Sequence, residues 1–84
     1  MSSGLLSGLV RSRPAMLGRS RACDLVLGDD SVSRRHAMLV REGDRIILTD
    51  LGSTNGTFVN GRQITEAEVQ PGDRLRLGDL DLVL

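Results

Sequence analysis

Three short polar stretches carry the residues of this sequence that could bind an anion. They are Gly18-Arg19-Ser20, Ser33-Arg34-Arg35-His36 and Ser53-Thr54-Asn55-Gly56. Together they supply planar arginine forks, hydroxyls, a carboxamide and flexible backbone, which a bound phosphate and its attached peptide require. A phosphothreonine brings about −1.5 to −2 charges and three acceptor oxygens, so it needs charge-assisted donors rather than an apolar slot. We therefore interpret the stretches as binding loops.

The third stretch lies within Asp50–Gly61, which holds two Asn-Gly pairs, Asn55-Gly56 and Asn60-Gly61, around the only aromatic residue, Phe58. Asn-Gly predicts a turn, because Gly adopts positive φ without a Cβ clash and Asn tolerates left-handed geometry. Two turns therefore bracket a short strand, Thr57–Val59, whose loops present backbone N–H groups and carboxamides at one edge of the domain. We expect Phe58 to anchor this strand in the core.

The elements that must position these loops are short strands. The expected strands are Leu5–Val10, Ala15–Leu17, Leu25–Leu27, His36–Val40, Arg45–Asp50, Thr57–Val59, Arg62–Ile64, Leu75–Leu77 and Leu80–Leu84. Glu42-Gly43-Asp44 and Gly78-Asp79 should each turn a hairpin, and the alternating leucines of the second hairpin should face one core. Thr65–Gln70 has capping-box spacing, but Pro71-Gly72 follows after barely one turn, so we expect a loop. Frequent turns and no helix predict an all-β sandwich or barrel.

Length and composition narrow the class of protein. Eighty-four residues are too few for a large interior active-site cavity, so binding is expected on loops at an edge. No apolar run reaches the roughly 18–20 residues of a membrane span, and residues 1–10 lack a signal-peptide pattern, so we expect a cytoplasmic protein with no membrane partner. The lone Cys23 excludes an intrachain disulfide and a multi-cysteine zinc site. Neither a metal nor a cofactor is predicted.

Two other chemistries fit single residues but not the whole set. Ser33, His36 and Asp50 are the residue types of a hydrolase triad, yet nothing in the sequence supplies an oxyanion hole or a substrate cleft. We expect no catalytic residue and a structural, hydrogen-bonded His36. Arg34-Arg35 and Arg11-x-Arg13 could form a nucleic-acid patch. The net charge is zero and no aromatic platform accompanies these arginines, so no nucleic-acid partner is expected.

The order of the motifs resembles that of the forkhead-associated (FHA) domain. The motifs that carry the resemblance are Gly18-Arg19-Ser20, Ser33-x-x-His36-Ala37, Asp50–Gly61, Gly72-Asp73 and Leu77-Gly78. They extend from about Leu17 to Leu84, and their shared order and spacing are more specific than any single motif. The resemblance implies a two-sheet β-sandwich (FHA/SMAD-like) of about 10–11 short, mainly antiparallel strands, with phosphothreonine-binding loops at one end.

The resemblance also implies a role for each matching residue. The phosphate contacts are Arg19, Ser33, Arg34 and Thr54, and the contact to the peptide backbone is Asn55. The loop-shaping residues are Gly18, His36, Gly56 and Asn60, of which Asn60 could instead contact peptide. The implied function is non-enzymatic binding of a phosphothreonine-containing protein or a Ser/Thr kinase. The alternative is a phosphate-independent scaffold or oligomerisation domain with the same fold.

The sequence departs from the family at both ends. The region before Arg19 is short, and the last strand is under way when the chain stops at Leu84. A missing edge strand, a swap between chains, or origin as a piece of a longer protein would each explain this departure. An unpaired edge would favour a dimer. We expect residues 1–84 to form a single FHA-like domain, with residues 1–4 frayed or added in cloning.

Overall fold

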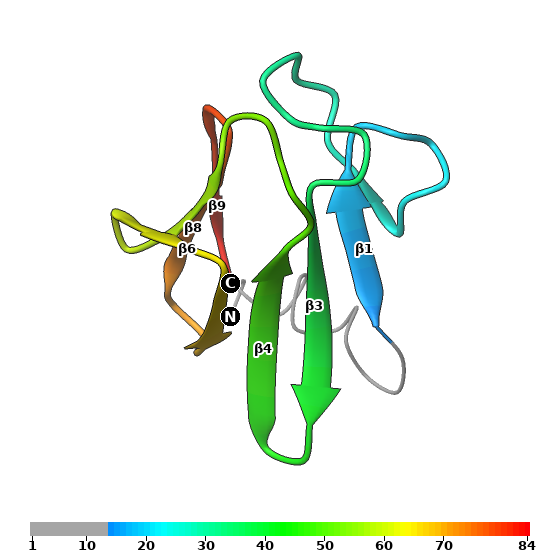
Figure 1. Cartoon of the computed structure of the whole chain (residues 1–84). Helices are drawn as coiled ribbons and strands as arrows, with labels where there is room; N and C mark the ends of the chain where they lie inside the picture. Colours follow the sequence, from blue (N-terminus) through cyan, green and yellow to red (C-terminus); the bar gives the residue numbers. More distant parts are fainter. Residues whose placement is uncertain (1–13) are drawn as a thin grey trace.

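The computed structural model of this chain describes residues 14–84, which form nine strands in two sheets (Figure 1). The strands are β1 (Ala15–Gly18), β2 (Leu25–Val26), β3 (Ala37–Glu42), β4 (Arg45–Asp50), β5 (Thr57–Val59), β6 (Arg62–Ile64), β7 (Glu66–Val69), β8 (Arg74–Leu77) and β9 (Leu80–Val83). The predicted all-β sandwich is confirmed. No helix that could cross a membrane occurs in this part of the chain. The expected strand Leu5–Val10 and residues 1–4 lie outside it.

The first sheet has the strand order β2-β1-β3-β4-β7, in which β1 and β2 are parallel and the other pairs are antiparallel. Its centre is the predicted hairpin of β3 and β4. Glu42 pairs with Arg45, which leaves Gly43 and Asp44 as a two-residue turn. Gly43 has a φ of 66°. Glycine at the first turn position is the requirement of a type II′ turn, whose twist matches that of the strands it joins.

The second sheet has the strand order β6-β5-β8-β9 and is antiparallel throughout. Asn60-Gly61 joins β5 to β6, and both residues have positive φ, at 50° and 86°, as a type I′ turn requires. Gly78-Asp79 joins β8 to β9, with a φ of 62° at Gly78. The predicted two-residue turn of this last hairpin is therefore confirmed.

Aliphatic side chains from both sheets fill the space between them. The fully buried leucines are Leu17, Leu39, Leu48, Leu75, Leu77 and Leu84. Leu80 and Leu82 are partly buried and pack against this cluster, so the leucines of the last hairpin do face one core, as predicted. Burying such a side chain stabilises the fold by about 1.5–3 kcal/mol. The core holds the two sheets together, and the sheets in turn fix the loops at their ends.

The prediction that Thr65–Gln70 forms a loop is wrong, because Glu66–Val69 is strand β7 and pairs with β4. Glu66 and Glu68 are exposed, whereas Ala67 is half-buried and Val69 is buried. This alternation has the period of a strand with one face on the core. Pairing along the open side of β4 therefore overrides the low strand propensity of Ala and Glu.

The prediction that Phe58 anchors β5 in the core is also wrong. Thr57 is fully buried and Val59 packs against the core, so Phe58 between them points to the opposite, outer face of the sheet. There the guanidinium carbon of Arg76 lies 5.3 Å from the centre of the half-buried Phe58 ring. The only aromatic side chain of the protein thus belongs to a surface.

Candidate functional site

The three predicted binding stretches lie together at one end of the sandwich, in the loops after β1, before β3 and after β4 (upper end of Figure 1). Main-chain N–H groups of Arg19 and Thr54 donate to the carbonyl and hydroxyl oxygens of Ser33, each at 3.0 Å. The side-chain amide of Asn55 donates to the carbonyl of Ser31 at 2.9 Å. The loop between β2 and β3 therefore lies at the centre of the site and ties the other two to itself.

Arg19 has its guanidinium oriented by the protein itself. Its Nε donates to the carbonyl of Val32 at 2.9 Å. Its side chain is exposed, and no other residue of the described part takes its two terminal nitrogens. Those two nitrogens form a planar, permanently charged pair of donors that matches two oxygens of a phosphate.

The backbone of Gly18 lies against the carbonyl of Arg34. A Cβ at Gly18 would lie 2.1 Å from that oxygen, so only glycine permits this approach. The same oxygen accepts the N–H of Ser20 at 3.1 Å and the thiol of Cys23 at 3.2 Å. Arg34 is thus fixed at its main chain, while its side chain is exposed beside the site.

The hydroxyl of Ser33 has one hydrogen-bonding role left for a ligand. Its oxygen accepts the N–H of Thr54, which leaves its own hydrogen free to be donated. Phosphate oxygens only accept, so this hydroxyl has the polarity that such a ligand requires. Thr54 is exposed next to it. Asn55 likewise keeps its side-chain oxygen and one N–H available, since only one amide hydrogen is donated to Ser31.

His36 is fully buried and holds two of the loops together. Its Nδ1 accepts the N–H of Ser33 at 3.0 Å, and its Nε2 lies 2.8 Å from the carbonyl of Gly56. These partners assign the neutral tautomer with the hydrogen on Nε2. Both ring nitrogens of His36 are therefore bonded to the backbone, and the carboxylate of Asp50 is bonded to Ser53 and Thr57 instead. Ser33, His36 and Asp50 thus do not assemble as a catalytic triad.

Asp50 shapes the loop between β4 and β5. Its carboxylate accepts the hydroxyls of Ser53 and Thr57 and the N–H groups of Gly52 and Ser53. Partial burial raises the pKa of Asp50, but these hydrogen bonds together outweigh it and lower the pKa below its ordinary value. The hydroxyl oxygen of Ser53 in turn accepts the N–H of Gly56. An ionised carboxylate therefore ties this loop together through four hydrogen bonds.

Ser31 joins the site to the turn between β8 and β9, a role that the sequence interpretation missed. Its hydroxyl donates to Asp29 and accepts the N–H of Asp79, both at 2.7 Å, while its carbonyl accepts Asn55. Hydrogen bonds from the hydroxyl and the N–H of Ser31 lower the pKa of Asp29. The Asp-x-Ser spacing of a side-chain turn was the local signal available. No local sequence signal predicts the contact with Asp79, which lies far along the chain.

Asn60 is not brought to the three loops. It lies at the other end of β5, where its side-chain oxygen accepts the N–H of Arg74 at 2.9 Å and its amide donates to Asp73 at 3.2 Å. These bonds brace the turn between β5 and β6 against the start of β8. Gly18, His36 and Gly56, by contrast, all lie within or directly beneath the loops.

Hydrogen-bond donors held on loops at one end of a β-sandwich can take the oxygens of an anionic ligand. The chain belongs to the FHA domain family, whose model matches residues 15–78. One relative is the oxoglutarate dehydrogenase inhibitor of Corynebacterium jeikeium, 41% identical over 66 residues, which cover 79% of this chain and 46% of the relative. FhaA of Mycobacterium tuberculosis is 36% identical over 75 residues, which cover 89% of this chain and 14% of FhaA. The chain thus spans half or less of these two relatives.

Solved FHA domains share the fold. The FhaA FHA domain, in complex with the intracellular domain of Rv3910, superposes with a TM-score of 0.83 at 36% identity, over 88% of this chain and 81% of that one. A structure from work on phosphothreonine-dependent FHA domain interactions gives a TM-score of 0.84, also at 36% identity, over 88% of this chain and 77% of that one. Mycobacterium tuberculosis EmbR in complex with a low-affinity phosphopeptide gives a TM-score of 0.79 at 32% identity, over 83% of this chain and 19% of EmbR. The predicted family is therefore confirmed.

Proposed function

We propose that this chain binds a protein partner at a phosphothreonine, as a non-enzymatic interaction module of Ser/Thr kinase signalling. The observation that carries the proposal is the hydroxyl of Ser33, fixed by Thr54 and left with a hydrogen to donate, on the loop that also bonds the backbone and Nε of Arg19. FHA domains are phosphothreonine-dependent interaction modules, and a relative has been solved with a phosphopeptide.

The proposal gives each loop a share of the ligand. Arg19 and Arg34 supply charge to the phosphate, and Ser33 and Thr54 supply hydroxyl donors. Asn55 takes the peptide backbone through the amide and carbonyl groups that its bond to Ser31 leaves free. Charge-assisted hydrogen bonds of this kind are about twice as strong as neutral ones.

The partner is proposed to be a phosphorylated protein or the kinase itself, in the cytoplasm, with neither nucleic acid nor membrane involved. Cys23 is a free, buried cysteine, which is compatible with a reducing compartment. The complex of the FhaA FHA domain with an intracellular domain supports a protein partner. Pairing of two copies through an edge strand is the competing use of the same fold.

A degenerate phosphothreonine peptide library should select a ligand, whose affinity is then measured by fluorescence anisotropy. We expect a dissociation constant of about 1 μM, no binding of the unphosphorylated peptide, and at least about tenfold weaker binding by Ser33→Ala. Binding should also weaken between about pH 7 and pH 5, because the second phosphate pKa is about 6. Equal affinity for both peptide forms, or a concentration-dependent dimer with no phosphopeptide ligand on sedimentation, would reject the proposal.

A further inference from the structure

The outer face of the second sheet carries a groove that the phosphate site does not use. It is a hollow of about 550 Å³, and the residues that line it are Phe58, Asn60, Gly61, Arg74, Arg76 and Asp81. A second hollow of about 370 Å³ continues it to the edge of β9 and is lined by Arg74, Asp81, Leu82 and Val83. Because the two hollows share Arg74 and Asp81, they form one groove across β5, β8 and β9.

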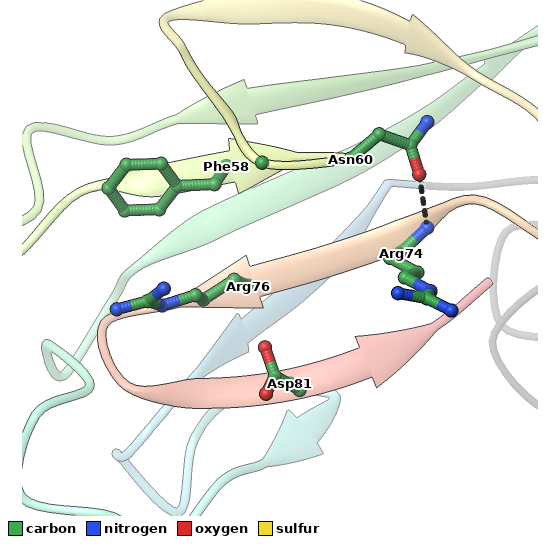
Figure 2. Close-up of a pocket in the computed structure, with 6 residues that line it drawn as sticks. Phe58, Asn60, Arg74, Arg76 and Asp81 are labelled. Carbon is green, nitrogen blue, oxygen red and sulfur yellow. Dashed lines mark hydrogen bonds between the residues drawn. The ribbon is translucent and has the colours of Figure 1, made fainter.

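Each end of this groove offers apolar surface. At one end the Phe58 ring lies beneath the guanidinium of Arg76, whose Nε donates to the carbonyl of Gly78 at 3.0 Å (Figure 2). At the other end Val83 is 57% exposed, more than any other large hydrophobic residue of the described part. Arginine and aromatic side chains that are fixed at a surface are enriched in protein interfaces.

Charged side chains without a partner in the described part of the chain lie between the apolar ends of the groove. Arg74 and Arg76 lie on the outer face of β8, opposite Val83 and Asp81 of β9 respectively. Figure 2 shows both arginines and Asp81 on this face. No hydrogen bond or ion pair within residues 14–84 engages the guanidinium of Arg74 or the carboxylate of Asp81. Arg76 forms an ion pair with Asp79 at 3.8 Å, whereas no ion pair of the described residues engages Arg74. The guanidinium of Arg74 therefore remains available to the carboxylate of a ligand.

The dimensions suit an extended chain. Neighbouring strands lie about 4.8 Å apart, so the groove runs about 10 Å or more from the strand of Phe58 to the strand of Val83. Every second side chain of an extended peptide faces the same way, at intervals of about 6.7 Å. Phe58 lies opposite Arg76, and Val83 lies opposite Arg74. A segment of five residues that runs diagonally from Phe58 to Val83 therefore places its third side chain over β8, between the two arginines.

We propose that this face binds an extended segment of a partner protein with the pattern apolar-x-acidic-x-apolar, independently of phosphate. The groove begins directly beneath the phosphate loops. A Cβ at Gly56 would lie 3.1 Å from the Phe58 ring, and the N–H of Gly78 donates to the carbonyl of Gly56. A partner held by the loops can therefore lay a neighbouring segment along this face.

The probe is the unphosphorylated peptide Gly-Leu-Ser-Glu-Ser-Leu-Gly, acetylated and amidated at its ends, titrated into the isotope-labelled protein and followed by amide chemical shifts. We expect shifts at Phe58, Asn60, Arg74, Arg76 and Asp81 with a dissociation constant of about 1 mM. The same peptide with Lys in place of Glu should bind at least about threefold more weakly. Raising the salt concentration should weaken the binding of the Glu peptide but not that of the Lys peptide.

Four variants are expected to change the affinity for the Glu peptide in different directions or not at all. Arg74→Gln and Arg76→Gln should weaken binding of the Glu peptide about two- to fivefold, whereas Asp81→Asn should strengthen it, because a like charge is removed. Arg41→Gln is the matched control for Arg76→Gln, since Arg41 Nε also donates to a turn glycine, Gly43, at 3.1 Å, but on the other sheet. It should leave the affinity unchanged.

Several results would overturn the proposal. These are equal affinities for the Glu and Lys peptides, chemical-shift changes confined to the phosphate loops, or weaker binding of the Glu peptide by Asp81→Asn than by the unmodified protein. Concentration-dependent shifts of the same face without peptide would assign it to a second copy of the chain instead. Arg19→Ala should keep the peptide affinity of the groove, so failure of the phosphothreonine site would not be mistaken for failure of this one.

Discussion

Arg19 illustrates how single residues of the site are prepared before a ligand arrives. Its main-chain N–H is bonded to Ser33 and its Nε to Val32, so neither the backbone nor the guanidinium must be ordered on binding. Such preorganisation reduces the entropy that binding would otherwise cost. Lysine would keep the positive charge, but it has neither an Nε–H donor nor a planar pair of terminal nitrogens.

Arg19→Lys should therefore weaken phosphopeptide binding about tenfold or more. A hydrogen bond to a charged group contributes about 1.5–3 kcal/mol, and 1.4 kcal/mol corresponds to a factor of ten. Anisotropy titration with the selected phosphopeptide measures the change. The matched control is Arg21→Lys, an exposed arginine two residues further along the same loop, which should stay within about twofold. Equal losses in both variants would show that charge alone matters.

The two Gly-Asp hairpins show how elements of the same local design acquire different roles. Gly43 and Gly78 occupy the same turn position, with φ of 66° and 62°. A Cβ at Gly43 would meet nothing within 4 Å, whereas one at Gly78 would lie 2.3 Å from the carbonyl oxygen of Ser31. The first turn ends a hairpin in solvent. The second supports the loop that carries Ser31 and, through it, Asn55.

Gly78→Ala should destabilise the fold by several kcal/mol and also weaken phosphopeptide binding. Gly43→Ala should cost only the strain of an alanine at positive φ, about 1 kcal/mol, and leave binding unchanged. Urea unfolding followed by far-ultraviolet circular dichroism gives both stabilities. A loss at Gly78 no larger than that at Gly43 would mean that the turn moves away from Ser31 without consequence.

Sequence predicted those elements whose cause is local. The Gly-Asp and Asn-Gly turns, the β3–β4 hairpin and the inward leucines depend on backbone freedom and on alternation. Strand β7 was missed because its pairing with β4 is a tertiary contact that propensity does not contain. The outward position of Phe58 was not predicted, because hydrophobicity alone favours burial and a strand of three residues gives only a weak signal of alternation. The bond from Asp79 to Ser31 joins loops far apart in the sequence.

For the molecule as a whole, stability in acid depends on the carboxylates whose pKa the fold lowers. The hydrogen bonds of Asp50 lower its pKa below 3.8, and those of Asp29 do the same. The unfolded chain therefore binds more protons than the folded one near pH 3.8, so stability rises with pH there. The contribution of both groups is present above about pH 4 and is lost as the pH falls through the folded-state pKa values.

Asp50→Asn should accordingly lower the free energy of unfolding by about 1–3 kcal/mol at pH 7, because the amide presents a donor to hydroxyls and N–H groups that now share a carboxylate. The difference from the unmodified protein should shrink as the pH falls below about 4, because Asp50 becomes protonated when the pH passes its lowered folded-state pKa. Urea unfolding across this pH range measures it. Asp44→Asn, in the exposed turn after β3, is the control and should change stability little at any pH. A constant difference for Asp50→Asn down to pH 2 would show that the loop depends on the shape of this side chain and not on its charge.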